Sequence, residues 1–413
     1  MKFYRILIYS IIILFLLTSV VLADDIDAEI FNDISSSIPT SSISNSEPTI
    51  NSRSAIVLDR SSGSILYGKA ENEKRKMAST TKIMTAIIVI ENSNLDNIVT
   101  VSSKAAGTGG SRLGLHTDDR ISIKDLLYGL LLCSGNDAAV TLAETVGGSI
   151  EGFADLMNKK AIDLGLVSTH FVTPHGLDND NHYTTAYELA LITNYALKNP
   201  TFCNFVRTKN YTVLINNSPK SLSNTNELLG NSDGVYGVKT GFTNGANRCL
   251  VTSIKRGNLD IICIVLGADT KKDRTKDSIA LIEYVFKNFK IIDIQEKITN
   301  EFSNWKICNS SSFNINKGIS NNIDVVLEDL PYKFLPINSN HQDDISIYIY
   351  CNTNFQAPLP AHSNIGHLAV NLDHQTVLTL NIYNSNEITK KASMNFYKDM
   401  FLKYTYYLES MFY

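Results

Sequence analysis

The sequence lacks the residue patterns that mark metal proteins, redox proteins and nucleic-acid-binding proteins. Its six cysteines are scattered without a C-x-x-C pair, and its eight histidines show no H-x-x-x-H or H-x-x-E-H spacing. The net charge is only -4, and the lysines and arginines form no basic run. We therefore expect no metal, no cofactor and no nucleic-acid partner, and we interpret the cysteines as buried free thiols rather than disulfides.

The N-terminus has the pattern of a secretory signal. Lys2 and Arg5 precede an apolar run over residues 6–17, and a small-residue cleavage site follows. The run is short for a membrane span, which favours a cleaved signal peptide at residues 1–23 over a retained anchor. Residues 24–52 are rich in Ser, Asn, Thr and Pro and lack apolar periodicity, so they predict a flexible linker. We expect the chain to be exported.

Residues 53–290 predict one α+β domain. Two strands flank a turn that contains Gly63, a mostly helical stretch follows over about 102–199, and three more strands and a helix complete the domain. This order predicts an antiparallel sheet flanked by helices, with an inserted all-helical lobe. The predicted strands are 54–59, 64–67, 234–240, 249–254 and 259–267, and the closing helix is 273–289.

The remaining chain predicts two smaller parts. Residues 291–385 hold short strand-like segments without a cluster of titratable groups, which indicates a small all-β domain. Residues 386–413 space apolar side chains by three and four, which is typical of one face of a helix. Nearby lysines favour a place in a membrane interface, and packing on the protein itself is the alternative. The apolar positions are Met394, Tyr397, Phe401, Tyr404, Leu408 and Met411.

A hydroxyl and an amine stand three residues apart in Ser79-x-x-Lys82, where a helix over 82–91 is predicted to begin. This spacing directs both side chains the same way, and Ser79 and Thr80 are candidate caps of the helix. A serine hydroxyl becomes a nucleophile when a neighbouring base removes its proton. Lys82 can be that base only as a neutral amine, so burial or a second cation must lower its pKa.

Two further motifs follow in order. Ser134-Gly135-Asn136 lies between two apolar helical patterns, and Lys239-Thr240-Gly241 lies at the end of a predicted strand. Taken singly, the first is typical of a loop with helix-capping residues and the second of a turn. Together with Ser79-x-x-Lys82 they match the set S-x-x-K, S-D-N and K-T-G, with Gly135 in place of the Asp.

On these three motifs the chain resembles the serine-type D-alanyl-D-alanine carboxypeptidases, the low-molecular-mass penicillin-binding proteins. The resemblance covers nearly the whole chain, and residues 174–177 and 269–274 also resemble segments of that family. It implies a transpeptidase/β-lactamase-like sheet, a small β domain and a C-terminal amphipathic helix. It also implies removal of the terminal D-alanine from peptidoglycan stem pentapeptides during cell-wall maturation, outside the cytoplasmic membrane. Penicillin and other β-lactams would acylate such an enzyme.

The resemblance assigns roles to the first two motifs. Ser79 would be the acylated nucleophile, and Lys82 would be the base that activates it. Ser134 would hand a proton to the departing D-alanine nitrogen. Asn136 would hold Lys82 and the backbone amide of the substrate in place.

The third motif would bind the substrate. Lys239 would be the second cation and would attract the substrate carboxylate, to which Thr240 would donate a hydrogen bond. Gly241 has no side chain, so a substrate can lie against the strand edge as an added strand. The backbone N–H groups of Ser79 and Phe242 would form the oxyanion hole.

Several other polar residues have two interpretations. His175, Asp178 and His182 either line the cleft and assist deacylation or form hydrogen bonds that stabilise their loop, which is the commoner use of such residues. Arg248 and Arg274 are candidate carboxylate ligands with the same alternative.

Competing functions share parts of this pattern. A β-lactamase would use the same acylation machinery, but the sequence lacks an E-x-x-L-N deacylation motif, since the nearest match, Glu188-Leu-Ala-Leu-Ile192, ends in Ile. A D,D-endopeptidase on the same fold is a second alternative. A catalytically silent, wall-associated scaffold is a third, and the intact motifs argue against it.

Overall fold

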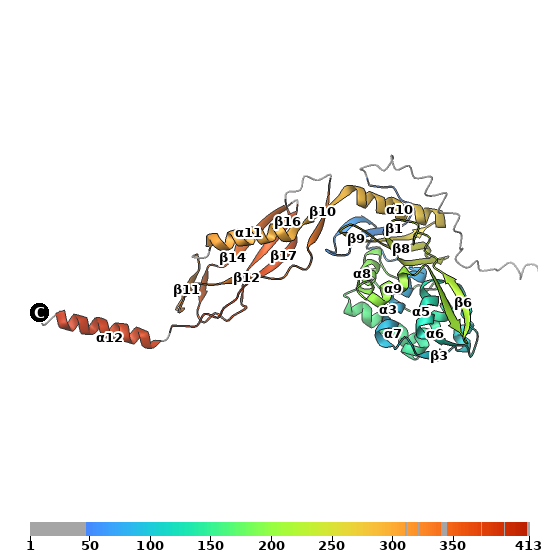
Figure 1. Cartoon of the computed structure of the whole chain (residues 1–413), viewed down its shortest axis with the longest axis horizontal. Coiled ribbons are helices and arrows are strands. Elements are labelled where there is room, and N and C mark those ends of the chain that lie inside the picture. The colour runs from blue at the N-terminus through green and yellow to red at the C-terminus, as the bar shows by residue number, and fades with distance from the viewer. Residues whose placement is uncertain are drawn as a thin grey trace, which may run out of the picture. The chain divides into compact units, whose positions relative to one another are not determined.

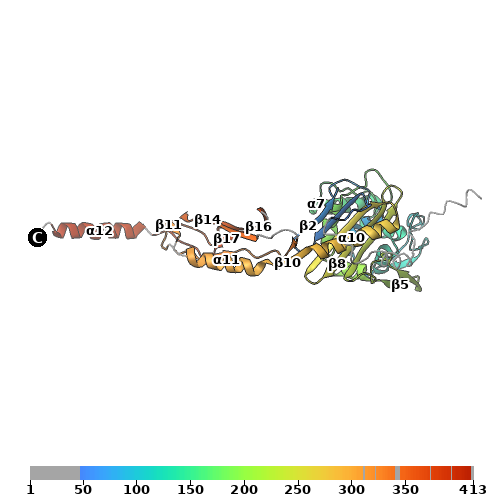
Figure 2. The ribbon, with the colours of Figure 1, turned by 90° about the horizontal axis from the view of Figure 1, so that it is seen from above.

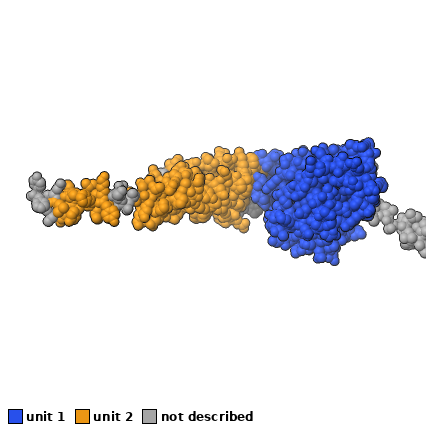
Figure 3. All heavy atoms as spheres, turned by 90° about the horizontal axis from the view of Figure 1, so that it is seen from below, with its two compact units in different colours: residues 1–289 blue, residues 290–413 orange. Residues whose placement is uncertain are grey.

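A computed structural model describes residues 47–309, 312–320, 322–339, 345–372, 374–391 and 393–410. The predicted signal peptide and most of the predicted linker lie outside these residues. The chain divides into two units, one ending at Phe289 and the other starting at Lys290 (Figure 3). The first unit already includes the end of the predicted linker, because Ser52 is buried and its hydroxyl donates to Asp277 Oδ2 at 2.6 Å.

A five-stranded antiparallel sheet in the order β2-β1-β9-β8-β7 forms the centre of the first unit. The predicted hairpin is confirmed as β1 and β2. Lys239-Thr240-Gly241 lies inside β7 rather than at its end, because β7 continues to pair with β8 as far as Thr243 and Asn247. Among the described strands β7 is an edge strand. The bounds are β1 (Ser54–Asp59), β2 (Ile65–Lys69), β7 (Val235–Thr243), β8 (Asn247–Arg256) and β9 (Leu259–Ala268).

Helices cover both faces of this sheet. Helix α10 (Lys271–Asn288) lies on one face and α8 (Ala186–Ala196) on the other (Figures 1 and 2). Strand β9 is therefore buried on both sides, with Ile262 packed in the core of the helical lobe and Cys263 against α10. This explains why β9 has a continuous apolar sequence instead of an alternating one.

The inserted lobe is helical, as predicted, and its centre is α3. Eight residues of α3 are buried because α5, α6, α7 and α8 surround it, which accounts for the apolar character of nearly its whole length. Two hairpins in the lobe, β3–β4 and β5–β6, were not predicted. The bounds are α3 (Lys82–Asn92), α4 (Ser103–Ala106), α5 (Ile123–Leu131), α6 (Asn136–Gly147), α7 (Ile150–Asp163), α9 (Pro200–Arg207), β3 (Ile98–Thr100), β4 (Arg120–Ser122), β5 (Asn210–Ile215) and β6 (Ser218–Ser223).

The second unit contains a four-stranded sheet in the order β12-β17-β16-β14 and two smaller strand pairs. The expected all-β domain is wrong in one element, because the unit also holds α11. Ile294, Ile298 and Phe302 recur every four residues and pack in its core, although the helix is polar overall. The bounds are β10 (Phe289–Asp293), α11 (Ile294–Asn309), β11 (Asn314–Asn316), β12 (Val325–Leu327), β13 (Phe334–Asn338), β14 (Ile345–Cys351), β15 (Asn354–Gln356), β16 (Asn364–Leu372), β17 (Gln375–Asn384) and α12 (Ser393–Ser410).

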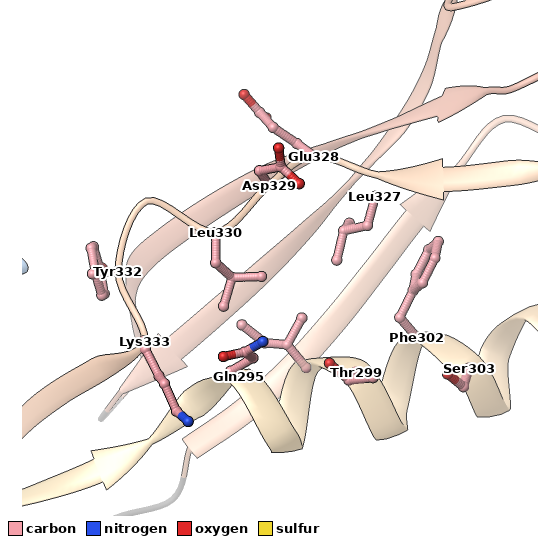
Figure 4. Close-up of a pocket in the computed structure, with 11 residues that line it drawn as sticks. Gln295, Thr299, Phe302, Ser303, Leu327, Glu328, Asp329, Leu330, Tyr332 and Lys333 are labelled. Atoms are coloured by element: carbon pink, nitrogen blue, oxygen red, sulfur yellow. The ribbon is translucent and has the colours of Figure 1, made fainter.

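A pocket of about 530 Å³ lies between α11 and the segment 327–333 (Figure 4). Leu327 and Leu330 point toward the helix, whereas Glu328 points away from it. Glu328 accepts hydrogen bonds from the backbone and side chain of Asn381, so it has a structural role within the unit. Both apolar and polar side chains line the pocket.

Helix α12 is confirmed as a helix, and several of its apolar side chains are exposed. Tyr397 and Phe401 are 64% and 68% exposed, and Tyr404 and Leu408 are also exposed. The side chain of Met394 and residue Met411 lie outside the described parts. No helix in the described residues is both long and apolar enough to cross a membrane.

Candidate active site

The predicted nucleophile lies on a single tight turn, η1 (Ala78–Thr81), that leads into α3. The prediction that Ser79 and Thr80 cap α3 is wrong. The N-cap is Thr81, without a side-chain cap hydrogen bond, and the Thr80 hydroxyl donates to Met77 O at 2.6 Å instead. The turn continues directly into the helix, so Ser79 lies one turn before Lys82 and its hydroxyl lies on the same side of the helix as the Lys82 side chain. Ser79 is half-buried.

Lys82 is fully buried, and its amine contacts residues from three separate segments. Its Nζ lies 2.8 Å from Ser79 Oγ, 2.8 Å from Asn136 Oδ1 and 3.0 Å from the carbonyl of His175. The predicted Ser79–Lys82 pair is thus in direct contact, and Asn136 holds the lysine. All three acceptors are neutral oxygens, and burial away from water penalises a charged ammonium.

The Ser134-Gly135-Asn136 segment enters the site between α5 and α6. Ser134 has a positive φ of 61°, uncommon for a residue with a side chain. Its hydroxyl is buried and has no hydrogen-bond partner among the described residues. Asn136 Nδ2 donates to Gly109 O at 2.8 Å, which orients the amide so that its oxygen faces Lys82. This loop therefore holds the Asn136 amide in a fixed orientation and leaves the Ser134 hydroxyl without a hydrogen-bond partner among the described residues.

Strand β7 brings the third motif to the same turn. A side chain at Gly241 would begin 3.0 Å from Ser79 N and 3.1 Å from Thr80 N, so β7 and η1 approach backbone to backbone. Lys239 occupies the same face of β7 as Gly241, because side chains alternate along a strand. Lys239 is buried, and its amine donates to Thr240 O at 3.0 Å. The structure thus brings Gly241 of the third motif directly against the first.

The remaining predicted substrate-binding residues lie next to Gly241. The Thr240 hydroxyl hydrogen-bonds that of Thr225 at 2.7 Å. Phe242 pairs with Arg248 across β7 and β8, and the guanidinium of Arg248 lies 3.7 Å from the centre of the phenyl ring. Arg274 is buried and forms an ion pair with Glu227.

The polar loop of the helical lobe supports the turn through two histidines. Burial lowers the pKa of His175 to about 3. Burial also lowers the pKa of His182 to about 4. His182 Nδ1 accepts from the Val172 N–H at 3.0 Å, so Nε2 carries the proton and donates to the Thr81 hydroxyl at 2.8 Å. Both imidazoles are neutral at neutral pH.

Asp178 joins the same loop to the chain that follows β7. Its carboxylate accepts from the Thr243 hydroxyl at 2.7 Å and from the Gly245 N–H at 2.9 Å. Asp178 therefore links the helical lobe to the β7–β8 turn.

The cysteines are not part of this chemistry. All six lie in described segments and none forms a disulfide. The expectation that they are buried holds for Cys249 and Cys263, but it is wrong for Cys308, which is exposed, and for the other three, which are partly buried. Burial raises the pKa of the Cys133 thiol, next to Ser134, to about 11, which keeps it protonated and weakly reactive.

Sequence reasoning missed the residues that hold these motifs. Asp137 is fully buried and accepts hydrogen bonds from the backbone N–H groups of residues 113, 114 and 115. Asn136 in turn is held by Gly109 and by the carbonyl of Ser111. The available signal was the sequence Gly-Thr-Gly-Gly-Ser at 107–111, which is typical of a chain that passes close to another backbone.

The geometry combines a hydroxyl touching a buried amine, a second hydroxyl in a buried loop and an edge strand that carries a buried lysine. A hydroxyl whose neighbour can remove its proton is suited to nucleophilic attack. A strand edge can hold an extended peptide beside it. The arrangement is therefore suited to acyl transfer from a peptide.

Comparison with known proteins agrees with this chemistry. The family model described as D-alanyl-D-alanine carboxypeptidase matches residues 41–270. The chain is 31% identical over 359 residues to D-alanyl-D-alanine carboxypeptidase DacF of Bacillus subtilis, a match that covers 86% of this chain and 90% of the relative.

Solved structures give the same result. Penicillin binding protein 5 from Haemophilus influenzae superposes with a TM-score of 0.70 at 27% identity, over 84% of this chain and 99% of its own. The Streptomyces K15 DD-transpeptidase has a TM-score of 0.57 at 35% identity, over 59% of this chain and 99% of its own.

Proposed function

The chain belongs to the D-alanyl-D-alanine carboxypeptidase family, and on this premise we propose that it removes the terminal D-alanine from peptidoglycan stem pentapeptides through an acyl-enzyme on Ser79. It is a serine-type peptidase, and its substrate class and sensitivity to β-lactams follow from the family. The observation that carries the residue assignment is the contact between the Ser79 hydroxyl and the buried amine of Lys82 at 2.8 Å.

Acylation begins when uncharged Lys82 takes the Ser79 proton. Ser79 Oγ attacks the carbonyl between the two D-alanines, and the carbonyl oxygen becomes negatively charged. The N–H groups of Ser79 and Phe242 stabilise that charge, and the close approach of β7 to η1 supports this pairing. Fixed backbone donors of this kind need no reorganisation during the reaction.

The C–N bond then breaks, and the leaving nitrogen must gain a proton. Ser134 delivers it, a role supported by its buried hydroxyl without a protein partner. Ser134 then regains a proton from protonated Lys82, so the proton that Ser79 lost ends on D-alanine and Lys82 is uncharged again. Asn136 holds Lys82 throughout and can also meet the backbone amide of the substrate. Water afterwards hydrolyses the ester and regenerates the Ser79 hydroxyl.

Recognition of the free C-terminus uses β7. Lys239 supplies positive charge, the Thr240 hydroxyl donates to the terminal carboxylate, and Gly241 leaves space for the substrate backbone. An edge strand suits this role, since an extended peptide can add to it through main-chain hydrogen bonds.

Cellular location is also part of the proposal. The family acts on peptidoglycan and so works outside the cytoplasm. We assign residues 1–23 to a signal peptide, 24–52 to a linker whose last residues pack on the first unit, 53–290 to the peptidase domain, 291–385 to a small domain and 386–413 to a membrane-associating helix. The exposed apolar side chains of α12 support a peripheral membrane contact.

Labelled penicillin tests the proposed nucleophile. The wild-type chain should acquire a covalent label and release D-alanine from a peptide ending in D-Ala-D-Ala, but not from one ending in L-Ala. Ser79→Ala should lose the label, and its D-alanine release should fall by at least about 10³-fold, as expected for removal of a nucleophile.

Ser93→Ala is the matched control. Ser93 is the C-cap of α3, at the opposite end of the helix from Ser79, and its hydroxyl donates to Val89 O at 2.6 Å. This variant should be labelled like the wild type. Label on Ser79→Ala, or no label on the wild-type chain, would show that the assignment is wrong.

A further inference from the structure

The chain between β6 and β7 connects the second and third motifs. The Thr225 N–H donates to Leu132 O, two residues before Ser134, at 3.1 Å. The Thr225 hydroxyl hydrogen-bonds the Thr240 hydroxyl at 2.7 Å. Thr225 therefore contacts the chain on both sides of the site without belonging to any of the three motifs.

Two residues later, the same segment is fixed to α10. The carboxylate of Glu227 accepts from the Arg274 guanidinium and from the Thr275 hydroxyl. The side chains of Glu227 and Arg274 are only 7% and 1% exposed. Burial raises the pKa of Glu227, but Arg274 and the hydroxyl outweigh it and hold that pKa below its ordinary value. A buried ion pair of this kind tolerates little displacement, because separating it would leave two unpaired buried charges.

Internal hydrogen bonds make the segment between these two contacts stiff. Asn226 is buried, and its side-chain oxygen accepts from the Leu228 N–H at 3.1 Å. Its own N–H donates to Asn224 Oδ1 at 3.0 Å. A shift of Glu227 would therefore be transmitted to Thr225.

We infer that Thr225 and Glu227 are positioning residues that orient the Thr240 hydroxyl toward the free carboxylate of the substrate. The inference rests on the proposed role of Thr240. A hydroxyl has one proton to donate and two lone pairs that accept. When Thr225 donates to Thr240, it fixes the direction in which Thr240 donates its own proton. Thr225 and Glu227 thereby contribute to selection of peptides with a free C-terminus.

The test compares two peptides that differ only at the C-terminus, one ending in D-Ala-D-Ala with a free carboxylate and one ending in D-Ala-D-Ala amide. Thr225→Val keeps the side-chain volume but removes the hydroxyl. The ratio of kcat/KM for the carboxylate over the amide should fall about 5- to 10-fold, which lies within the range for loss of one hydrogen bond between neutral groups. Thr225→Ser, which restores the hydroxyl, should restore the ratio.

Glu227→Gln tests the other contact and has a matched control on the same helix. In this variant the ratio of kcat/KM for the carboxylate over the amide should also fall, because the segment that carries Thr225 and Glu227 loses its ion pair with α10. Glu283 also fixes α10, because it forms an ion pair with Arg256 of β8 at 2.8 Å. Within the described residues, the hydrogen bonds and ion pairs of Glu283 do not involve Thr225 or residues 224–228. Glu283→Gln should keep the wild-type ratio. A general loss of folding would lower activity on both peptides and leave the ratio unchanged.

Thr225→Val keeps the inference falsifiable if Glu227→Gln fails to fold. The inference is overturned if the Thr225→Val chain folds and keeps the wild-type ratio of kcat/KM for the carboxylate over the amide. The proposed function remains intact in that case, provided that the wild-type chain still takes the penicillin label on Ser79. Absence of label on the wild-type chain overturns the proposed function and the inference with it.

Discussion

The surroundings of Lys82 explain how one side chain can serve as a base. Its amine contacts the oxygens of Ser79, Asn136 and His175. When the amine is uncharged, its lone pair can accept the Ser79 proton across the same 2.8 Å, while its N–H groups still donate to the other two oxygens. Proton transfer thus requires no movement of the side chain, which is the benefit of a preorganised site.

The buried histidines predict a specific pH dependence of stability. The pKa of His182 is about 4, below its ordinary value of 6.5, because burial disfavours the charged form. Between these two values the unfolded chain binds a proton that the folded chain does not, so stability falls as the pH is lowered from 6.5 toward 4. From pH 7 to pH 5 this single group should cost about 2 kcal/mol of unfolding free energy.

His182→Gln should remove that cost. Urea unfolding at pH 7 and pH 5 should show that the variant loses about 2 kcal/mol less than the wild type between the two values. His116→Gln is the control, since the side chain of His116 is 86% exposed whereas that of His182 is buried. An equal loss in the wild type and in His182→Gln would contradict this prediction.

The turn η1 depends on glycines in the elements that enclose it. Gly241 of β7 approaches it from one direction. Gly176 of the polar loop approaches from another, with a positive φ of 84° and a virtual Cβ only 1.9 Å from Ala78 O. Neither contact tolerates a side chain without a shift of the turn. The position of the Ser79 hydroxyl is therefore set by two segments that follow it by about a hundred residues or more.

Gly176→Ala should displace η1 and slow acylation. A misplacement of about 1 Å is sufficient to reduce a rate about 10²-fold, so penicillin labelling should slow by at least that factor. Gly165→Ala is matched in backbone, with a φ of 73°, but its virtual Cβ meets nothing within 4 Å. It should cost about 1 to 2 kcal/mol of stability from the left-handed backbone alone and keep the labelling rate. Equal labelling rates in the two variants would contradict the role given to Gly176.

The same contacts show where sequence reasoning reaches its limit. The 3-residue spacing of Ser79 and Lys82 is local, so their contact followed from helix geometry alone. The contribution of His175 to the site is a backbone carbonyl, which no residue type reveals. The hairpin β5–β6 was missed because β6 is polar and contains Pro219, and α11 because only three well-spaced apolar residues mark its buried face. Such features depend on tertiary partners rather than on local pattern.

At the scale of the whole molecule, the proposed mechanism uses residues of the first unit. Every contact named in the active site joins residues before Lys290. The Streptomyces K15 DD-transpeptidase is matched over 99% of its length by only 59% of this chain. In the described part of the second unit, α12 carries the largest set of exposed large apolar side chains.

Helix α12 should bind lipid surfaces through its exposed apolar side chains. Phe401 and Leu408 lie two turns apart on one face, with Lys398 and Lys403 on the same helix to meet anionic headgroups. Each apolar side chain contributes about 1.5 to 3 kcal/mol when it leaves water. Replacing both with serine should therefore weaken cosedimentation with vesicles containing phosphatidylglycerol by at least about 100-fold.

The control for this prediction lies in the first unit. Ile162 and Val167 are 75% and 87% exposed but are not on α12, so Ile162→Ser with Val167→Ser should leave vesicle binding unchanged. Release of D-alanine from a soluble peptide should be the same in all three chains, because none of these residues belongs to the proposed active site. If the α12 variant binds vesicles as tightly as the wild type, the exposed face has a different partner. Loss of binding with full activity would instead show that α12 binds lipid independently of the peptidase activity.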